Sequence, residues 1–191
     1  MKNPKAIKTI LIEVFSIVLG VMLALGVSEW QQEREYAQLA DTALANVAWE
    51  LRSNLEVLTR IHENNVETIE LSEAETNDQS APPEDRQFIP GVQVRSTAWD
   101  TLLSSGLANH IDYKLLLSLS EIYSSQGIYR QMGLQIVEAS MSMAAMATVN
   151  RTELDNEIFQ EQFSSYFNML LQMEEVLLEG YEETIASLAK Y

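Results

Sequence analysis

The stretch Thr9–Trp30, TILIEVFSIVLGVMLALGVSEW, decides how the rest of the chain is organised. From Thr9 to Val27 it contains one ionisable residue, Glu13, among apolar and small side chains. As a helix, residues 9–27 would be about 28 Å long, close to the roughly 30 Å hydrocarbon core of a bilayer. The sequence therefore predicts a helix that spans a membrane.

The charges on either side of this stretch predict its orientation. They are Lys2, Lys5 and Lys8 before it, and Glu29, Glu33, Arg34 and Glu35 after it. Because basic residues stay on the cytoplasmic side, we expect residues 1–29 to form a cytoplasmic tail and a transmembrane helix. Residues 30–191 would form an extracytoplasmic domain. Trp30 stands where an aromatic side chain anchors a helix at the membrane surface.

A cleaved signal peptide is the competing interpretation, since Ala24-Leu25-Gly26 resembles a cleavage site with two small residues. The apolar run is long for a signal peptide, and it carries Glu13. Helical periodicity also continues beyond Trp30. These features favour a retained anchor.

One face of the predicted span carries small residues. Ser16, Gly20 and Ala24 recur every four residues, a spacing that lets two helices approach closely in a membrane. Glu13 lies on the same stripe. It would either pack against another membrane helix or reach the inner surface, where a lysine could neutralise it. We hypothesise that Glu13, Ser16, Gly20 and Ala24 form a helix–helix contact face.

The composition is acidic and contains no cysteine. The formal net charge of the 191 residues is −16. The first 27 residues contribute three lysines and one glutamate, so the remainder carries −18. Such a domain repels nucleic acids and anionic headgroups. Without cysteine, disulfides, thiolate metal sites and a cysteine nucleophile are excluded.

From Trp30 to about Glu75 neither proline nor glycine interrupts the chain. Apolar residues recur there at steps of three or four, namely Ala40, Leu44, Val47, Leu51, Leu55, Leu58 and Ile61. This pattern predicts an amphipathic helix, continuous with the span, whose charged and amide side chains face outward. Thr76–Arg86 ends it with Pro82-Pro83. Phe88–Gly91 is expected to pack back onto the bundle.

Three further helices are predicted from capping and stop signals. The signals are a capping box at Thr97–Asp100 with a stop at Gly106, an N-cap at Asp112 for a helix to about Asn150, and a capping box at Thr152–Asp155 for a helix to about Ala189. Trp99 is expected to anchor the core. The predicted fold is all-α, with one transmembrane helix continuing into an antiparallel bundle of three long helices plus one short helix.

Two blocks resemble a large bacterial family known only as a domain of unknown function. Glu13-Val14 through Gly20-Val21-Met22-Leu23-Ala24-Leu25 to Trp30 resembles the family's E-[IV]…G-[IV]-x-x-A-L…W anchor. Its second block is similar to Thr97-Ala98-Trp99-Asp100-Thr101-Leu102 with Ser105-Gly106, Leu115-Leu116 and Ile122-Tyr123. The resemblance covers roughly residues 10–130. This chain departs from it at Ser28, where the family often has asparagine, and in its acidity. The resemblance implies a retained anchor and a helical domain, without an activity.

Candidate metal ligands are few. Met141, Met143 and Met146 have the MxMxxM spacing that can bind Cu(I), but on a helix only the last two are neighbours, so core packing is preferred. His62 and His110 are the only histidines and are expected at the surface or at helix ends.

The pairs Glu174-Glu175 and Glu182-Glu183 lack the Glu-x-x-His motif of a di-iron site and are interpreted as solvated. We expect no catalytic, cofactor-binding or metal-binding residues, and no enzyme.

The leading hypothesis is a non-enzymatic, single-pass protein of the bacterial inner membrane with an acidic periplasmic domain. It would contact the bilayer and bind protein rather than nucleic acid, as an accessory or scaffolding subunit of a membrane complex or as a homo-oligomer. The alternative is a ligand- or cation-sensing bundle resembling chemoreceptor sensor domains. Such receptors have a second span and a cytoplasmic output module, so sensing here would act through a partner.

Overall fold

A computed structural model describes the backbone of residues 4–75, 89, 91, 93–146 and 153–190, and the side chains of 13–70, 89, 91, 93–142 and 165–190. The described residues form helices and no strands. In chain order these are α1 (Pro4–Glu75), α2 (Thr97–Ser104), the short 3₁₀ helix η1 (Leu107–His110), α3 (Tyr113–Met146) and α4 (Glu153–Leu188). The predicted all-α class, with three long helices and one short helix, is confirmed.

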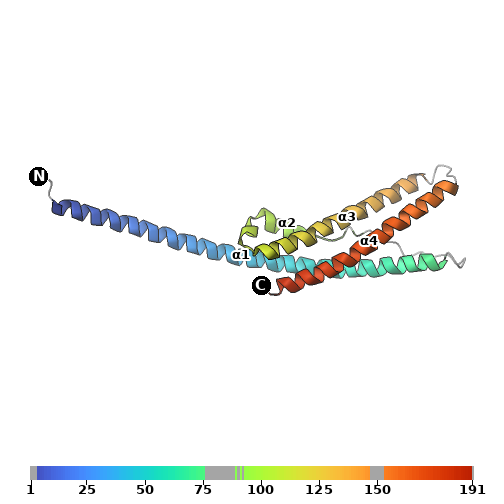
Figure 1. Ribbon diagram of the computed structural model, residues 1–191, viewed down its shortest axis with the longest axis horizontal. Coiled ribbons are helices and arrows are strands. Elements are labelled where there is room, and N and C mark those ends of the chain that lie inside the picture. The colour runs from blue at the N-terminus through green and yellow to red at the C-terminus, as the bar shows by residue number, and fades with distance from the viewer. Residues whose placement is uncertain (1–3, 76–88, 90, 92, 147–152, 191) are drawn as a thin grey trace.

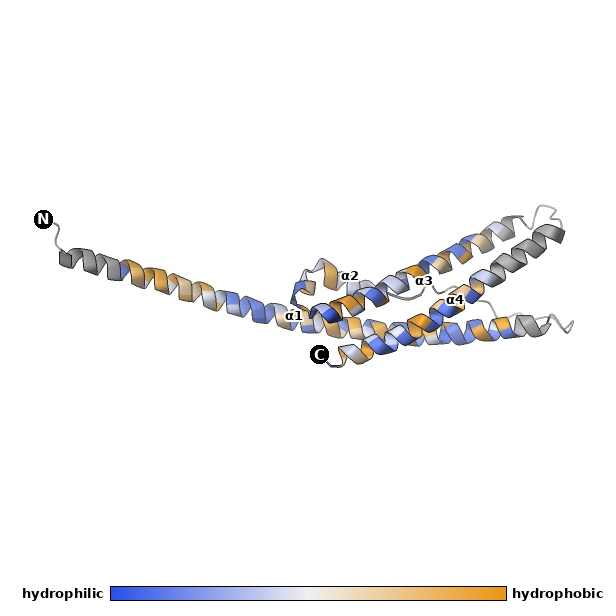
Figure 2. Ribbon diagram, viewed as in Figure 1, coloured by the Kyte–Doolittle hydropathy of each residue, from blue (hydrophilic) through white to orange (hydrophobic). Residues whose placement is uncertain are grey.

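Helix α1 dominates the shape of the molecule. Its 72 residues correspond to a rod of about 108 Å, and its N-terminal part extends far beyond the other helices (Figure 1). This part is coloured as apolar, followed by a hydrophilic stretch before the bundle (Figure 2). Of the described residues, only α1 has a segment long and apolar enough to cross a membrane. The predicted continuity of the apolar segment with the amphipathic helix is confirmed.

The three long helices are not all antiparallel to one another. α4 runs antiparallel to both α1 and α3 and packs against both (Figure 1). α1 and α3 run in the same direction, because α2 and the start of α3 lie at the end of the bundle from which the N-terminal part of α1 emerges (Figure 1). There α2 and η1 pack against α1.

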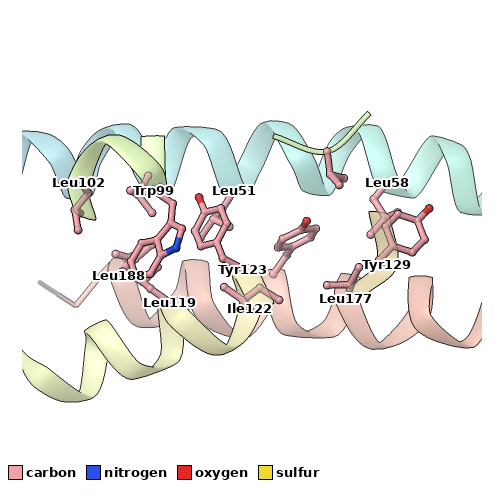
Figure 3. Packing of buried hydrophobic residues seen from close by; sticks show 14 of the residues in the cluster. Leu51, Leu58, Trp99, Leu102, Leu119, Ile122, Tyr123, Tyr129, Leu177 and Leu188 are labelled. Carbon is pink, nitrogen blue, oxygen red and sulfur yellow. The ribbon is translucent and has the colours of Figure 1, made fainter. Parts of the chain in front are cut away.

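The core lies where α1, α3, α4 and α2 meet (Figure 3). Leu51 and Leu58 of α1, Leu119 of α3 and Leu177 of α4 are fully buried in it. Trp99 is buried and stacks on Tyr123, with 5.2 Å between ring centroids and 4° between planes. Its predicted role as a core anchor is confirmed.

Two of the predicted helix signals are confirmed. Asp112 caps α3, because its Oδ1 accepts hydrogen bonds from the backbone N–H groups of Lys114 (2.9 Å) and Leu115 (3.2 Å). Gly106 has φ +76°, a left-handed conformation that favours glycine after the end of α2.

The capping box predicted at Thr97–Asp100 is wrong. Helix α2 has Ser96 in the N-cap position. The Ser96 hydroxyl donates a hydrogen bond to the Asp100 carboxylate and does not cap a backbone N–H. The Ala98 N–H instead donates to Glu50 Oε2 of α1 at 2.9 Å. A carboxylate from a neighbouring helix therefore satisfies the start of α2. The capping box predicted at Thr152–Asp155 depends on Thr152, which lies outside the described residues.

Two asparagines of α1 hold the segment that returns to α2. Asn65 accepts from the Ile89 N–H (2.8 Å) and donates to the Ile89 carbonyl (3.0 Å). Asn54 pairs with Arg95 in the same way, at 2.9 and 2.7 Å. Each side-chain amide thus forms the same pair of hydrogen bonds with the segment that a peptide group of a neighbouring β-strand would form. Ile89 and Gly91 pack onto the bundle as predicted, whereas Phe88 and Pro90 lie outside the described residues.

Candidate functional site

The predicted contact face lies on the part of α1 that leaves the bundle. Glu13, Ser16, Gly20 and Ala24 are all exposed. A Cβ added at Gly20 would meet nothing within 4 Å. At 3.6 residues per turn the four positions share one side of the helix. The rest of the described chain leaves this side uncovered.

Trp30 follows the apolar segment and is 55% exposed, and the Arg34 guanidinium carbon lies 4.6 Å from its ring centroid. This cation–π contact is local to one turn of α1. The first ring contact from α1 to another element is Tyr36 stacked on His110 of η1, with centroids 4.8 Å apart. The bundle therefore begins at about Tyr36, and His110 lies at its surface as predicted.

The bundle core contains a carboxylate that the sequence interpretation placed in solvent. Glu174 of α4 is fully buried, so its assignment to a solvated face is wrong. Its Oε1 accepts hydrogen bonds from Tyr129 (2.8 Å) and Asn65 (2.9 Å), and its Oε2 lies 3.0 Å from His62 Nδ1. His62 is therefore a partner of a core carboxylate rather than a free surface histidine.

Burial raises the pKa of Glu174 above its ordinary value of 4.5, and the bonds from Tyr129, His62 and Asn65 oppose that rise. Burial also raises the pKa of the Tyr129 phenol far above its ordinary value, with Glu174 adding to the shift. The raised pKa favours the protonated phenol, which donates to Glu174. Gly91 packs on this phenol so closely that an added Cβ would overlap it.

Two further polar layers lie nearer the end of the bundle from which the N-terminal part of α1 emerges. In one, Gln126 of α3 donates to the Arg95 carbonyl (2.8 Å) and accepts from Asn54 (3.1 Å) and Tyr181 (2.6 Å). In the other, Tyr123 donates to Glu50 Oε1 at 2.8 Å. No buried side-chain nitrogen or oxygen among the described residues lacks a partner. These layers fix how α1, α3 and α4 pack together.

An open groove lies between α1 and the α2–η1 region, with a volume of about 590 Å³. Its lining is largely apolar and includes Leu39, Ala43, Trp49, Leu102 and Leu107, with Glu50 and Arg95 as the charged members. Trp49 is 64% exposed. The sequence interpretation missed this groove, because it forms only when α2 folds back against α1.

The methionine hypothesis concerns the far end of α3. Met141 is 68% exposed and does not pack in the core. The side chains of Met143 and Met146 lie outside the described residues. Within the described part of the chain, no three His, Cys, Asp or Glu side chains group as metal ligands.

Comparison with protein-family models, with curated proteins and with solved structures finds no significant match for this chain. The geometry of α1, of the bundle core and of the groove is therefore the basis for a proposed function.

Proposed function

We propose that this chain is a non-enzymatic, single-pass membrane protein that acts through protein–protein contacts, as an accessory or scaffolding subunit of a membrane complex or as a homo-oligomer. Residues 1–29 would comprise a cytoplasmic tail and the span, and residues 30–191 the domain outside the cytoplasm. The lysines before the span and the glutamates after it support this orientation in a bacterial inner membrane.

The observation that carries the proposal is the state of α1 before the bundle. Every described side chain from Glu13 to Leu39 is exposed. Valine, leucine and phenylalanine side chains there are about half to two-thirds exposed, as at Phe15 (68%) and Leu23 (63%). Lipid can cover such a surface. The stripe of Ser16, Gly20 and Ala24 offers lipid little side chain but lets a second helix approach closely.

Helix continuity supports a coupling role. The rod that crosses the membrane is the same helix that supplies Leu51 and Leu58 to the core. A partner bound at the span and a partner bound at the bundle would therefore contact one stiff element. The acidic domain favours partners with basic surfaces, because its charge attracts them over several ångströms.

The test replaces Gly20 and Ala24 together with leucine in the full chain. We expect chemical crosslinking within the membrane, and stoichiometric co-purification in mild detergent, to fall at least tenfold. The melting temperature of the bundle should not change, because these residues contact nothing in the bundle.

The matched control is Val18→Leu with Met22→Leu. These positions lie about 120–160° around the helix from Gly20 and Ala24, and the change should leave association intact. A Gly20→Leu/Ala24→Leu variant that associates as the unsubstituted protein does would refute the contact face. A strictly monomeric, partner-free particle in detergent and in lipid discs would refute the proposed function itself.

A further inference from the structure

The groove between α1 and α2 holds a carboxylate without a cationic partner. Glu50 is 4% exposed and forms part of the groove lining. Its Oε2 accepts the Ala98 N–H and its Oε1 accepts the Tyr123 hydroxyl. No described lysine, arginine or histidine lies within ion-pair distance of it. Each carboxylate oxygen has a second lone pair, so Glu50 can accept further hydrogen bonds.

This carboxylate is held rigidly, whereas the other charge in the groove is not. The two donors to Glu50 belong to α2 and to α3, which fix its position relative to the groove wall. The Arg95 side chain is exposed, and no hydrogen bond or ion pair holds its guanidinium. It can therefore extend into water. The fixed charge in the groove is negative.

The surroundings of Glu50 suit an organic cation with an apolar body. The indole of Trp49 is 64% exposed and adjoins the groove, and aromatic faces attract ammonium groups. Leu39, Ala43 and Leu102 provide apolar surface for the rest of a ligand. The volume of about 590 Å³ is in the range of small-molecule sites. The charge of −18 on residues 28–191 draws cations toward the domain.

We propose that this groove binds a small organic ammonium compound, with the ammonium group near Glu50 and Trp49 and the apolar body along α1 and α2. A bare divalent ion fits poorly, because calcium and magnesium take several oxygen ligands and the groove wall supplies one carboxylate besides an arginine. The site is independent of the membrane contact face, since none of its residues belongs to the span.

The test uses three probes that share a phenylbutyl body: 4-phenylbutylammonium, 4-phenylbutan-1-ol and 5-phenylpentanoate. Binding to the full chain in lipid discs is measured by titration calorimetry, with empty discs as the reference. We expect the ammonium probe to bind at least about tenfold more tightly than the alcohol, because hydrogen bonds to charged groups are stronger than neutral ones. The carboxylate probe should bind most weakly.

Two substitutions locate the site. Glu50→Gln keeps an oxygen for the Ala98 N–H but removes the charge, and it should bring the affinity for the ammonium probe down to that for the alcohol. Trp49→Leu should weaken binding of the ammonium probe several-fold. Because Trp49 is exposed, this variant tests the site even if Glu50→Gln fails to fold. Trp30→Leu, an exposed tryptophan outside the groove, is the matched control and should change nothing.

Equal affinity for the ammonium and alcohol probes would overturn the proposal. So would tighter binding of 5-phenylpentanoate, which would make Arg95 the recognition group. Unchanged ammonium binding in both Glu50→Gln and Trp49→Leu would also overturn it, because the cation would then bind elsewhere.

Discussion

The two halves of helix α1 differ in where their polar and apolar side chains lie. From Glu13 to Leu39 every described side chain is exposed, and apolar residues dominate as far as Val27. From Ala40 to Glu70 buried or half-buried positions recur every three or four residues, and several of the buried ones are polar, including Glu50, Asn54 and Asn65. The first half is apolar on the outside, and the second half has polar groups on the inside. One regular backbone therefore serves two environments, and the side chains alone distinguish them.

The contrast also shows where each half gains its stability. Leucine packing and bonded polar layers stabilise the bundle half within the chain itself. The apolar surface of the first half is not buried by any other described element. In the proposed function, lipid or another helix removes it from water. Substitutions in the two halves should therefore act on different measurements.

The largest expected effect comes from replacing one leucine in each half of α1 and comparing the two changes in stability. Leu58→Ala in the bundle half removes a fully buried side chain and should lower the free energy of unfolding by about 2–5 kcal/mol. Leu25→Ala in the first half, where Leu25 is 60% exposed, should leave it within about 0.5 kcal/mol. Thermal and urea unfolding of the full chain in non-ionic detergent measure both changes. Equal destabilisation by the two variants would mean that the halves are not independent.

A smaller effect is expected for the polar groups of the bundle half. Asn54→Ala would leave the Arg95 N–H without its partner. It would also remove one of the two donors to the Arg95 carbonyl and one of the two donors to Gln126 Oε1. We expect a loss of about 1–3 kcal/mol in the free energy of unfolding. Asn46→Ala is the matched control, because Asn46 is exposed one face away on the same helix and should change stability little. A neutral Asn54→Ala would indicate that the returning segment contributes nothing to stability.

The smallest expected effect is a pH dependence. Burial raises the pKa of Glu174 above 4.5, so its ionised form is disfavoured in the folded state. The protonated Glu174 carboxyl contributes its full stabilisation of the folded state when the pH is below the ordinary pKa. This contribution to the free energy of unfolding is lost as the pH rises through the raised pKa, by at most about 1.4 kcal/mol per pH unit.

Glu174→Gln imitates the protonated form at every pH and removes this dependence. As pH rises, the melting temperature of Glu174→Gln should therefore increase relative to that of the unsubstituted protein. His62→Gln, in each background, controls for the neighbouring imidazole. A difference that does not vary with pH would contradict the raised pKa.

Periodicity and capping chemistry were sufficient for most of the fold. The spacing from Ala40 to Ile61 predicted the bundle half of α1, and Asp112 and Gly106 predicted helix ends, because these signals depend on residues a few positions apart. The capping box at Thr97 failed for the opposite reason. The group that satisfies the start of α2 is Glu50, which is 48 positions away from Ala98.

The buried polar layers were the main feature that sequence patterns could not supply. Glu174 stands next to Glu175 and resembles a solvated pair, yet it faces Tyr129 and His62 across the bundle. A carboxylate is buried only when distant donors meet it, and distant donors leave no local pattern. The groove was missed for the same reason. The contact face from Glu13 to Ala24, which the crosslinking experiment addresses, and the anchor at Trp30 stay predictions.

Asn54 and Asn65 place a constraint on chain length that the first half of α1 does not share. They are eleven residues apart, close to three full turns, so both amides point toward the same returning segment. One inserted residue between them would swing one amide about 100° away from its partner. Before Tyr36 no such pairing is present in the described chain, and an added residue there would only turn the span relative to the bundle. Insertions should therefore be tolerated between residues 28 and 35, where α1 has not yet reached the bundle, and not between residues 54 and 65.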